Sequence, residues 1–413
     1  MSFRTSLSGL DAAATDLSVV GNNIANASTN GFKESRAEFV DVFATSFSGV
    51  SGNTPGSGVR VSTIAQQFSQ GNIEFTSSNL DLAINGEGFF ILDDNGSLAY
   101  TRAGAYTTDR DGFIVDSSGR QLQVFPPNNN GTFNTGSLAS IQLSTNDSAP
   151  AATSTVDPVL NLDSRQGVPI NPTFDPLDAD TYNHSTSTTV YDSLGNDFPA
   201  TMYFVSTNPA TNTWDVHTQI NGTTVTVGGG ASFSLSFNTD GTFQTANGSV
   251  TGQVTLDSFS IGNGSAPINI TFDYQNMTQY GSDFAVNGLS QNGFASGRLS
   301  GIDIDPSGVV FAQFTNGQSK ALGQIALGTF PNSQGLRQLG DSSWAETFSS
   351  GDRIVGAAGT AGFGNLQSAA LESSNVDIAT QLVNLITSQR NFQANAQAIS
   401  TQDTIQQAII NIR

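Results

Sequence analysis

The first apolar pattern along the chain is an amphipathic stripe near its start. Its members recur at alternating intervals of four and three residues, the heptad spacing of a helix that packs against other helices. The pattern predicts a helix over residues 2–27, because the Asn-, Ser- and Gly-rich segment 26–31 then competes for backbone hydrogen bonds and stops it. The stripe consists of Phe3, Leu7, Leu10, Ala14, Leu17, Gly21 and Ile24.

A second stripe with the same spacing occupies the last part of the chain and predicts a helix from residue 375 to the end. The segment "SNVD", Ser374 to Asp377, resembles a capping box in which Asp replaces Glu. The stripe consists of Ile378, Leu382, Leu385, Gln389, Phe392, Ala396, Ile399, Asp403, Gln406 and Ile410.

The flanks of both stripes carry Ala, Ser, Thr, Asn and Gln, whereas a free two-stranded coiled coil normally carries Glu and Lys there. Two interpretations stay open. The terminal helices either form only an intramolecular hairpin, or they also pack into a polymer in which every copy contributes two helices to a shared core. The uncharged flanks favour the polymer.

Between the two helices the pattern changes to short alternating runs bounded by Asn-Gly, Asp-Gly and Ser-Gly turns, which predict β-strands. We interpret the fold class as α+β and multidomain, with the terminal helices forming an inner domain and two mainly β outer domains, the outermost inserted into the other. The expected parts are a helical domain (1–27 plus 364–413), an extended linker holding a short hairpin (28–70), a first β-domain (71–145 plus 285–363) and an inserted β-domain (146–284).

Composition and charge narrow the function classes. Charged residues make up only 12% of the 413, the formal net charge is −20 and there are just two lysines, so no basic face is available for nucleic acid or an anionic membrane. The terminal segments 1–32 and 365–413 are nearly neutral, so most of the negative charge lies between them. There is no cysteine, no apolar run long enough to span a membrane and no recognisable cleavable signal. This composition is typical of an exported surface protein.

Candidate catalytic and metal-binding chemistry is weak. "TTDRDG" and "DIDPSG" lack the further ligands of a calcium loop, so turn formation explains Asp109, Asp111, Asp303 and Asp305. "GEGFF" lacks the third glycine and the helix of a dinucleotide-binding motif. No nucleophile-elbow sequence accompanies the two histidines, His184 and His217, which we expect on strands or loops. We expect Phe89, Phe90, Phe113 and Trp344 in the core and take the sequon at Asn183 as fortuitous. The sequence therefore predicts no catalytic residue, no metal site and no cofactor.

Three long segments carry a family resemblance. "LSGLDAAATDLSVVGNNIANASTNGFKESRAEF" resembles the N-terminal signature of bacterial flagellar rod and hook proteins, and "ALESSNVDIATQLVNLITSQRNFQANAQAISTQDTIQQAIINIR" resembles their C-terminal signature. "LDLAINGEGFFIL" with "YTRAGAYTTDRDGFIVDSSGRQL" resembles the β-motif of their first outer domain. The chain length and the expected inserted domain resemble the hook members rather than the shorter rod members.

The resemblance implies a structural subunit that polymerises into a short curved tube joining rod to filament and acts as a universal joint. It implies an extracellular location in the flagellum, reached through the flagellar type III apparatus without a cleavable signal peptide. The implied partners are further copies of the chain, the rod, the hook–filament junction, the hook cap and the export components, with no nucleic acid and no membrane insertion. The alternatives are a distal rod or hook–filament junction subunit, a secreted β-rich adhesin and an acidic extracellular hydrolase.

Two groups of residues follow as expected sites. The assembly positions on the helix stripes are Phe3, Leu7, Leu10, Ala14, Leu17, Ile24, Ile378, Leu382, Leu385, Phe392, Ala396, Ile399 and Ile410. The resemblance adds Asn22, Asn23, Asn26, Gly31, Phe32, Asn375, Asp377, Gln389, Arg390 and Asn395 as signature positions. We expect hinges in the Gly/Ser-rich residues 48–58 and near residues 145 and 285. In free subunits the terminal helices should be largely disordered, because isolated amphipathic helices are marginal without packing.

Overall fold

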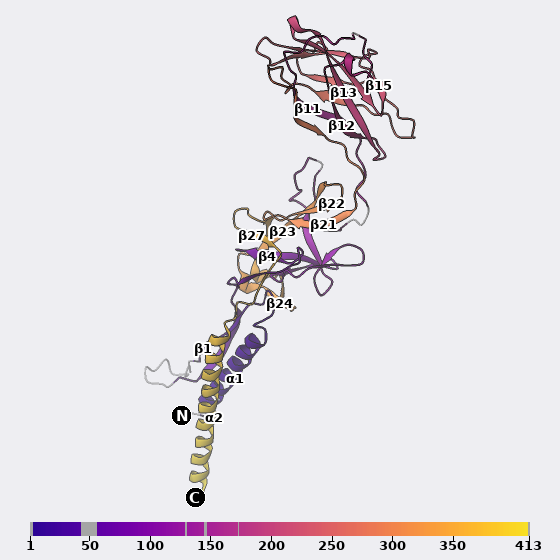
Figure 1. Ribbon diagram of the computed structural model, residues 1–413. Helices are drawn as coiled ribbons and strands as arrows, with labels where there is room; N and C mark the ends of the chain where they lie inside the picture. Colours follow the sequence, from indigo (N-terminus) through magenta and orange to yellow (C-terminus); the bar gives the residue numbers. More distant parts are fainter. Residues whose placement is uncertain (1–2, 43–55, 129, 144–146, 172, 412–413) are drawn as a thin grey trace. The chain divides into compact units, whose positions relative to one another are not determined.

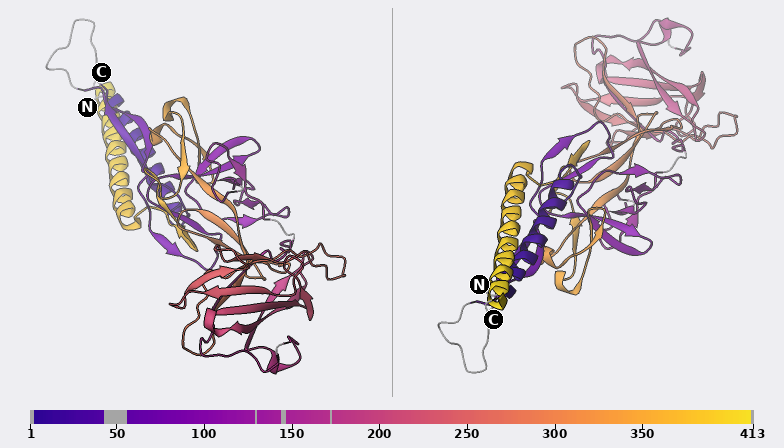
Figure 2. Two further views of the ribbon diagram at one scale, coloured as in Figure 1. Left: turned by 90° about the horizontal axis from the view of Figure 1, so that it is seen from above. Right: turned by 90° about the horizontal axis from the view of Figure 1, so that it is seen from below.

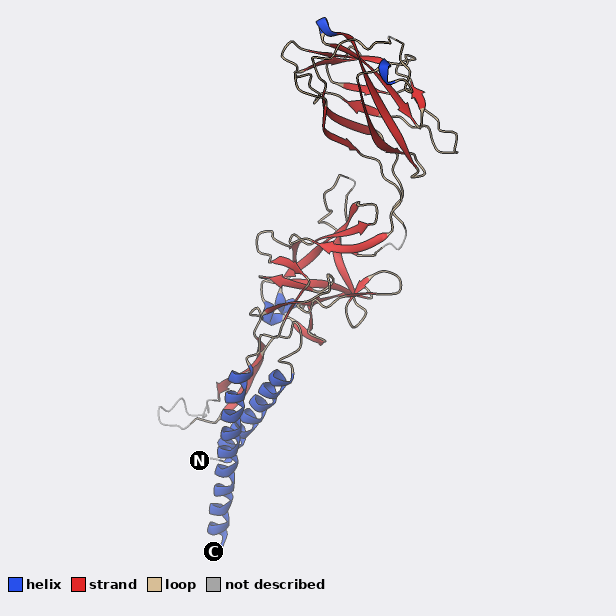
Figure 3. Ribbon diagram, in the orientation of Figure 1, coloured by secondary structure: helices blue, strands red, loops and turns tan. Residues whose placement is uncertain are grey.

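The computed structural model is a mixed α+β protein, mostly β, with two α-helices that contact each other (Figures 1 and 3). The structure describes residues 3–42, 56–128, 130–143, 147–171 and 173–411. The chain divides into two compact units. Unit 1 comprises Met1–Thr145, Gly301–Gln313 and Ser319–Arg413, and unit 2 comprises Asn146–Ser300 and Phe314–Gln318. Neither α-helix in the described ranges combines the length and apolar character needed to cross a membrane.

The terminal helices are α1 (Phe3–Ala25) and α2 (Ile378–Asn411), both in unit 1. They lie side by side in all views (Figures 1 and 2). The asparagine segment ends α1 as expected: Asn26 donates both its backbone N–H and its Nδ2 to the carbonyl of Asn22, at 3.1 and 3.0 Å. Both predicted helices are confirmed: α1 ends two residues earlier than expected and α2 begins three residues later.

The cap of α2 differs from the expected capping box. Asp377, not Ser374, is the residue whose side chain caps the helix: its Oδ1 accepts from the backbone N–H of Ala379 at 2.8 Å and of Thr380 at 3.2 Å. Ser374 Oγ instead accepts from Val376 N–H at 3.3 Å, before the helix begins. The reason is that Asp is itself a strong N-cap residue and directly precedes the first helical turn.

The expected short hairpin in the linker is present. β1 (Ser35–Asp41) and β2 (Val59–Gln66) pair antiparallel from Ser35↔Gln66 to Asp41↔Val59, with a register shift between Glu38 and Phe39. Both strands pack against α1. The residues between them, 43–55, lie outside the described ranges and include most of the expected hinge at 48–58.

The rest of unit 1 is built on one large, mainly antiparallel sheet. Its path runs β21-β22-β23-β9-β5-β6-β25-β24, with β7, β8, β10 and β26 pairing at its sides. The strands are β5 (Phe89–Asp94), β6 (Ser97–Thr101), β7 (Thr107–Thr108), β8 (Ile114–Val115), β9 (Gln121–Phe125), β10 (Ala139–Ser140), β21 (Leu299–Ile304), β22 (Val309–Phe314), β23 (Ser319–Thr329), β24 (Arg337–Gly340), β25 (Ser343–Ala345) and β26 (Ile354–Ala357). The short turns η3 (Ser333–Gly335) and η4 (Phe348–Ser350) connect its strands.

Two small antiparallel pairs join the early and late parts of the chain within unit 1. β3 (Ile73–Phe75) pairs with β28 (Ala370–Glu372), and β4 (Leu82–Asn85) pairs with β27 (Asn365–Ser368). These pairs bring the segment that follows the hairpin next to the segment that leads into α2.

The central strand β5 shows why this sheet has a core on both faces. Phe89 and Ile91 belong to one buried cluster with Tyr100, Phe125 and Trp344, whereas Phe90 and Leu92 belong to another. Successive side chains of a strand point to opposite faces, so an uninterrupted apolar run such as "FFIL" fits a strand that is covered on both sides. The core prediction is confirmed for Phe89, Phe90 and Trp344, while Phe113 is only half-buried.

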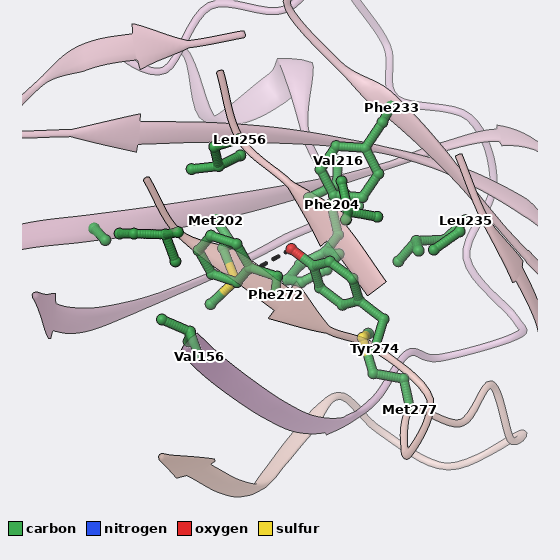
Figure 4. Packing of buried hydrophobic residues seen from close by; sticks show 14 of the residues in the cluster. Val156, Met202, Phe204, Val216, Phe233, Leu235, Leu256, Phe272, Tyr274 and Met277 are labelled. Atoms are coloured by element: carbon green, nitrogen blue, oxygen red, sulfur yellow. Dashed lines mark hydrogen bonds between the residues drawn. The ribbon is translucent and has the colours of Figure 1, made fainter. Parts of the chain in front are cut away.

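Unit 2 consists of two sheets around one core. The sheets are β18-β19-β11-β20 and β12-β13-β14-β16-β17, with β15 on β14. The strands are β11 (Thr155–Asn161), β12 (His184–Tyr191), β13 (Asp197–Asn208), β14 (Thr213–Ile220), β15 (Thr223–Val225), β16 (Phe233–Phe237), β17 (Phe243–Ala246), β18 (Gln253–Thr255), β19 (Thr271–Asp273) and β20 (Ala285–Gln291), with short turns η1 (Ala179–Thr181) and η2 (Pro209–Thr211). Their inward side chains meet in the cluster of Figure 4, where Tyr274 lies over Met202 with its hydroxyl 3.7 Å from the sulfur.

The expected boundary at residue 284 differs from the structure. β20 pairs antiparallel with β11, from Asn161↔Ala285 to Val156↔Gln291. These backbone hydrogen bonds tie residues 285–291 to unit 2, which continues to Ser300. The expected hinge near 285 therefore falls on the first residues of a paired strand.

Candidate functional site on the terminal helices

The two terminal helices meet through small and polar residues. Asn23 Nδ2 lies 3.4 Å from Gln381 Oε1, and Ser388 Oγ donates to Asp16 Oδ2. A Cβ added at Gly9 would lie 2.7 Å from Asn395 Oδ1, so these two residues also face each other closely. Along α1 the three contacts are seven residues apart, and along α2 they descend by seven. The helices are therefore antiparallel, with one matched contact every heptad, and we call these contacts the polar rungs.

The face of α1 toward α2 is not the predicted stripe but the one a residue earlier. Its buried members include Ser6, Ala13, Val20 and Asn23. The predicted stripe lies beside this face: Phe3 is 48% exposed and Leu7 42%, while Leu10, Ala14, Leu17 and Ile24 are partly exposed. The physical reason is that a close helix pair favours small residues at the contact, and these alternate with the larger apolar ones on α1.

The predicted stripe of α2 divides between two environments. Leu385, Phe392, Ala396 and Ile399 are partly buried, whereas Ile378, Leu382 and Ile410 are exposed. Other apolar residues of α2 are exposed as well: Val383, Ile386, Ile405 and Ile409. The helix pair thus leaves a large set of apolar side chains uncovered within one chain. Clustered exposed apolar surface marks interaction sites, so this pair is the candidate functional site.

We call the C-terminal end of α1 and the N-terminal end of α2, with the segments that join them to the sheet, the bases of the helices. The bases are joined by a buried charge cluster, which we define as Lys33, Arg102 and Glu372. Lys33 Nζ lies 2.6 Å from Glu372 Oε1, with both side chains fully buried, and Arg102 Nη1 lies 3.3 Å from Oε2. Lys33 also donates to the carbonyl of Ser69 at 2.7 Å, and Arg102 donates to that of Gly86 at 2.8 Å. Burial lowers the pKa of Lys33 and of Arg102, and the negative charge of Glu372 opposes both shifts.

Sequence reasoning missed this cluster. Lys33 was noted only as one of two lysines, and nothing in the sequence pairs it with a glutamate 339 positions away. The only signal for this cluster in the sequence is the scarcity of lysine. Lys33 is one of two lysines and lies just after the asparagine segment, which favours a specific partner for it.

Several signature residues form hydrogen bonds that hold the same region together. Asn375 accepts from Glu34 N–H at 2.8 Å and donates to the carbonyls of Gln67 and Ser69 at 2.8 and 3.2 Å. Asn23 exchanges two hydrogen bonds with the backbone of Ser35, at 2.8 and 3.0 Å. The remaining members divide: Asn22 and Asn26 bond each other, Asp377 caps α2, Asn395 faces Gly9, and Gln389 and Arg390 are exposed.

Gly31 shows why one signature position is glycine. Its φ is +68°, and a Cβ there would lie 2.3 Å from the backbone nitrogen of Ala103. Its N–H donates to the carbonyl of Glu372 at 2.8 Å. The chain leaving α1 therefore passes so close to the β-sheet unit that no side chain fits.

A cavity of about 560 Å³ lies beside this region, and sequence reasoning did not predict it. Its lining includes Asn22, Asn26 and Phe32 from the end of α1 and the segment after it, and the carboxylate residues Asp116 and Asp341. The lining is mixed in character, and Phe32, a signature residue, borders it.

The residues weighed for chemistry have structural roles where the structure describes them. Asp109 Oδ1 accepts from the backbone N–H of Asp111 and of Phe113, and Asp305 Oδ1 accepts from Val309 N–H, so both are turn residues as predicted. His184 and His217 lie on β12 and β14 as expected. The structure adds that they stack on Phe284 and Phe174, with ring centroids 4.5 and 3.9 Å apart, and burial lowers the pKa of each. Asn183 accepts from Ser206 N–H at 2.7 Å.

Family comparisons cover both ends and the middle of the chain. Residues 3–33 match the family described as "Flagella basal body rod protein", and residues 367–412 match "Flagellar basal body rod FlgEFG protein C-terminal". Residues 83–157 match "Flagellar hook protein FlgE/F/G D1 domain", and residues 161–294 match "Flagellar basal body protein FlaE D2 domain".

Whole-chain relatives agree with these matches. The chain is 38% identical to the flagellar hook protein FlgE of Escherichia coli (strain K12), with all of both chains covered, and 32% identical to that of Borreliella burgdorferi, covering 100% and 99%. Among solved structures, the flagellar hook protein FlgE2 of Helicobacter pylori matches with a TM-score of 0.53 at 16% identity, covering 73% of this chain and all of the other. At that identity the likeness concerns the fold.

Proposed function

The chain belongs to the flagellar hook protein family, and we propose from this membership that it is a structural, non-enzymatic subunit that polymerises into the bacterial flagellar hook. The observation that carries the proposal is the helix pair. Each chain leaves the apolar residues of α1 and α2 exposed, including Phe3, Leu7 and Leu382, although the two helices already contact each other. Such a surface suits burial against the same helices of other copies.

The finer assignment follows the order of the chain. The helices, assigned as 1–27 and 364–413, would form the inner tube, the β-strands of unit 1 the next layer and unit 2 the outer one. Two features support this: the nearly neutral terminal segments suit a packed helical core, and the net charge of −20, concentrated between them, suits a surface in water. Within this arrangement the stripe residues are the assembly positions, including those that lie beside the face of α1 toward α2.

The proposed partners are those of a hook subunit. They are copies of the same chain, the rod, the hook–filament junction, the hook cap and the flagellar type III export components. Export as an unfolded chain would deliver the protein outside the cell without a cleavable signal. The absence of cysteine from the 413 residues is compatible with passage through a narrow channel, since no disulfide can form before export.

Curvature requires rigid parts joined by compliant segments, so that strands of subunits shorten on the inside and lengthen on the outside. We assign these segments to residues 48–58 and to the junction near residue 145. The hinge expected near 285 is not kept, because Ala285 begins the paired strand β20. The Gly- and Ser-rich composition of residues 48–58 is typical of linker sequences, and each unit has its own buried core.

Electron microscopy of the full-length chain at high concentration tests the function. The wild type should form curved tubes, and a variant with Phe3, Leu7 and Leu382 changed to Ser should form none, because it loses exposed apolar surface on the helices. The control is Ile170→Ser, which removes an even more exposed apolar side chain, but from unit 2, and should still polymerise. Straight tubes would favour a rod-type subunit, and no polymer from the wild type would favour the adhesin.

A further inference from the structure

Glu372 gathers donors from three separate parts of unit 1. Its carboxylate accepts from Lys33 Nζ at 2.6 Å, from Gly71 N–H at 2.8 Å and from Arg102 Nη1 at 3.3 Å. Its backbone carbonyl accepts from Gly31 N–H at 2.8 Å. The donors lie after α1, after the β1–β2 hairpin and in the large sheet, while Glu372 itself lies six residues before α2. One buried side chain thus holds the bases of both terminal helices against the body of unit 1.

The cluster contains two cations and one anion, so its members are not equivalent. Glu372 is the only carboxylate that ion-pairs with Lys33 or Arg102 in the described chain, and Glu87, which is exposed, adds a weaker attraction to Arg102. Removing the carboxylate leaves two buried cations uncompensated. Removing Lys33 leaves one cation opposite one anion, and the carbonyl of Ser69 keeps its hydrogen bond from Asn375. Uncompensated buried charge is strongly unfavourable, whereas a matched pair is tolerated.

The position of the cluster bears on how the helices pair. α1 and α2 lie at opposite ends of the sequence, and a heptad seam alone also permits pairing slipped by seven residues. In the structure the polar rungs join Gly9, Asp16 and Asn23 of α1 to Asn395, Ser388 and Gln381 of α2, respectively. The charge cluster lies next to the last of these rungs, at the helix bases. Fixing the bases side by side removes most of the freedom to slip.

We propose that Glu372 is a positioning residue that docks the bases of both terminal helices on unit 1 before the helices themselves order, and so selects the antiparallel register of the polar rungs. This inference concerns a single chain and does not rest on polymerisation. It separates the base of each helix, which docks first, from the helix itself, which orders afterwards along the polar rungs.

Amide hydrogen exchange of the free, full-length chain tests the docking. In the wild type, peptides covering residues 26–42 and 59–75 should be protected. Glu372→Gln should accelerate their exchange ~100-fold or more, because two cations lose their counter-charge. Lys33→Met should accelerate it less than ~10-fold. The double variant Lys33→Met/Glu372→Gln should exchange more slowly than Glu372→Gln alone, since one uncompensated cation is removed.

Arg36→Gln is the matched control, because Arg36 pairs with Glu38 at the surface, with the Arg36 side chain 65% exposed, and its loss should leave exchange unchanged. Equal effects of Glu372→Gln and Lys33→Met, or no recovery in the double variant, would contradict the charge argument. Unprotected peptides in the wild type would overturn the docking itself, whether or not tubes form.

Cysteine cross-linking of the full-length chain reads the register on a background that has no cysteine. The pair Asp16→Cys/Ser388→Cys joins residues that touch, and Asp16→Cys/Asn395→Cys joins residues one heptad out of register. With Glu372 present, only the first pair should oxidise readily within one chain. With Glu372→Gln, the preference for the first pair should fall at least tenfold. An unchanged preference would rule out a role for Glu372 in register selection.

Discussion

At the scale of single residues, this chain places glycine and charge where other residues would not fit. The passage of Gly31 beside Ala103 and the burial of Glu372 are both consequences of bringing the end of α1 against the sheet of unit 1. Neither residue belongs to an apolar pattern, so hydrophobic periodicity alone does not reveal what they do.

Gly31→Ala should destabilise unit 1 by about 3 kcal/mol or more, because a positive φ strains any Cβ and the added atom would overlap the backbone of Ala103. Gly119→Ala is the control: Gly119 also has a positive φ, +83°, but has open space around it, so only the strain of ~1 kcal/mol should remain. Chemical unfolding followed by the fluorescence of Trp344, with Trp214 replaced by Phe, measures both. Equal losses would mean that the contact with Ala103 does not form.

Acid stability of unit 2 should depend on Asp192. Burial acts to raise its pKa, but hydrogen bonds from Asn196, Asn263 and Leu194 outweigh this effect and hold the pKa at about 2. Since the folded pKa lies below the usual 3.8, the stabilisation is complete above pH 4 and is lost as the pH falls towards 2.

Asp192→Asn should therefore lower the free energy of unfolding of unit 2 at pH 7 by about 1–3 kcal/mol, because an amide cannot accept all of these hydrogen bonds. The difference from wild type should shrink between pH 4 and pH 2. Trp214 fluorescence, with Trp344 replaced by Phe, follows unit 2. Asp157→Asn, at an exposed position of β11, is the control, and a constant difference down to pH 2 would contradict the assignment.

At the scale of elements, the periodic patterns predicted both helices, the linker hairpin and the β character of the middle. They failed at the face of α1 that meets α2. The larger apolar residues form the most conspicuous stripe on α1. The contact with α2 is made instead by the adjacent residues Gly9, Ala13 and Asp16, which a search for hydrophobic periodicity does not detect. The residues left outside match the stripe that the proposed function assigns to contacts with other chains.

The end of the outer β-domain was misplaced for a related reason. Residues 285–291 were expected in the first β-domain, yet β20 pairs with β11, about 130 residues earlier in the chain. Strand pairing over such a separation depends on register and neighbours that no local window contains. Long-range polar partners, such as Lys33 and Glu372, are hidden from the sequence in the same way.

Capping of α2 gives a prediction at this scale. In a peptide spanning residues 370–413, Asp377→Ala should lower helicity, since loss of an N-cap carboxylate costs about 1 kcal/mol, whereas Ser374→Ala should change it little. Far-ultraviolet circular dichroism compares the two substitutions directly. A larger effect of Ser374→Ala would restore the capping box expected from "SNVD".

At the scale of the whole molecule, the chain combines two β-rich units, and both terminal helices belong to unit 1. Each unit has its own buried core and its own tryptophan, Trp344 in unit 1 and Trp214 in unit 2. Movement between the units need not disturb either core, which is what a subunit of a bending tube requires.

Stiffening residues 48–58 with two prolines should straighten the tubes or stall their growth, because the Gly/Ser-rich segment would lose its compliance. Electron microscopy of tubes from wild type and variant measures the curvature. Two alanines at the same positions are the control and should leave it nearly unchanged. Curved tubes in the proline variant would mean that the hinge lies in the segments that connect the two units instead.

The polar rungs carry one more consequence, for the fate of a subunit that has not yet reached its place. Gln381, Ser388 and Asn395 occupy every second position of the seam on α2. Two terminal segments that meet alone therefore share few apolar contacts and should pair weakly. In the proposed tube, where many copies surround each segment, the exposed apolar side chains beside the rungs add the contacts that two segments alone do not share. Association would then depend strongly on how many copies are already in place.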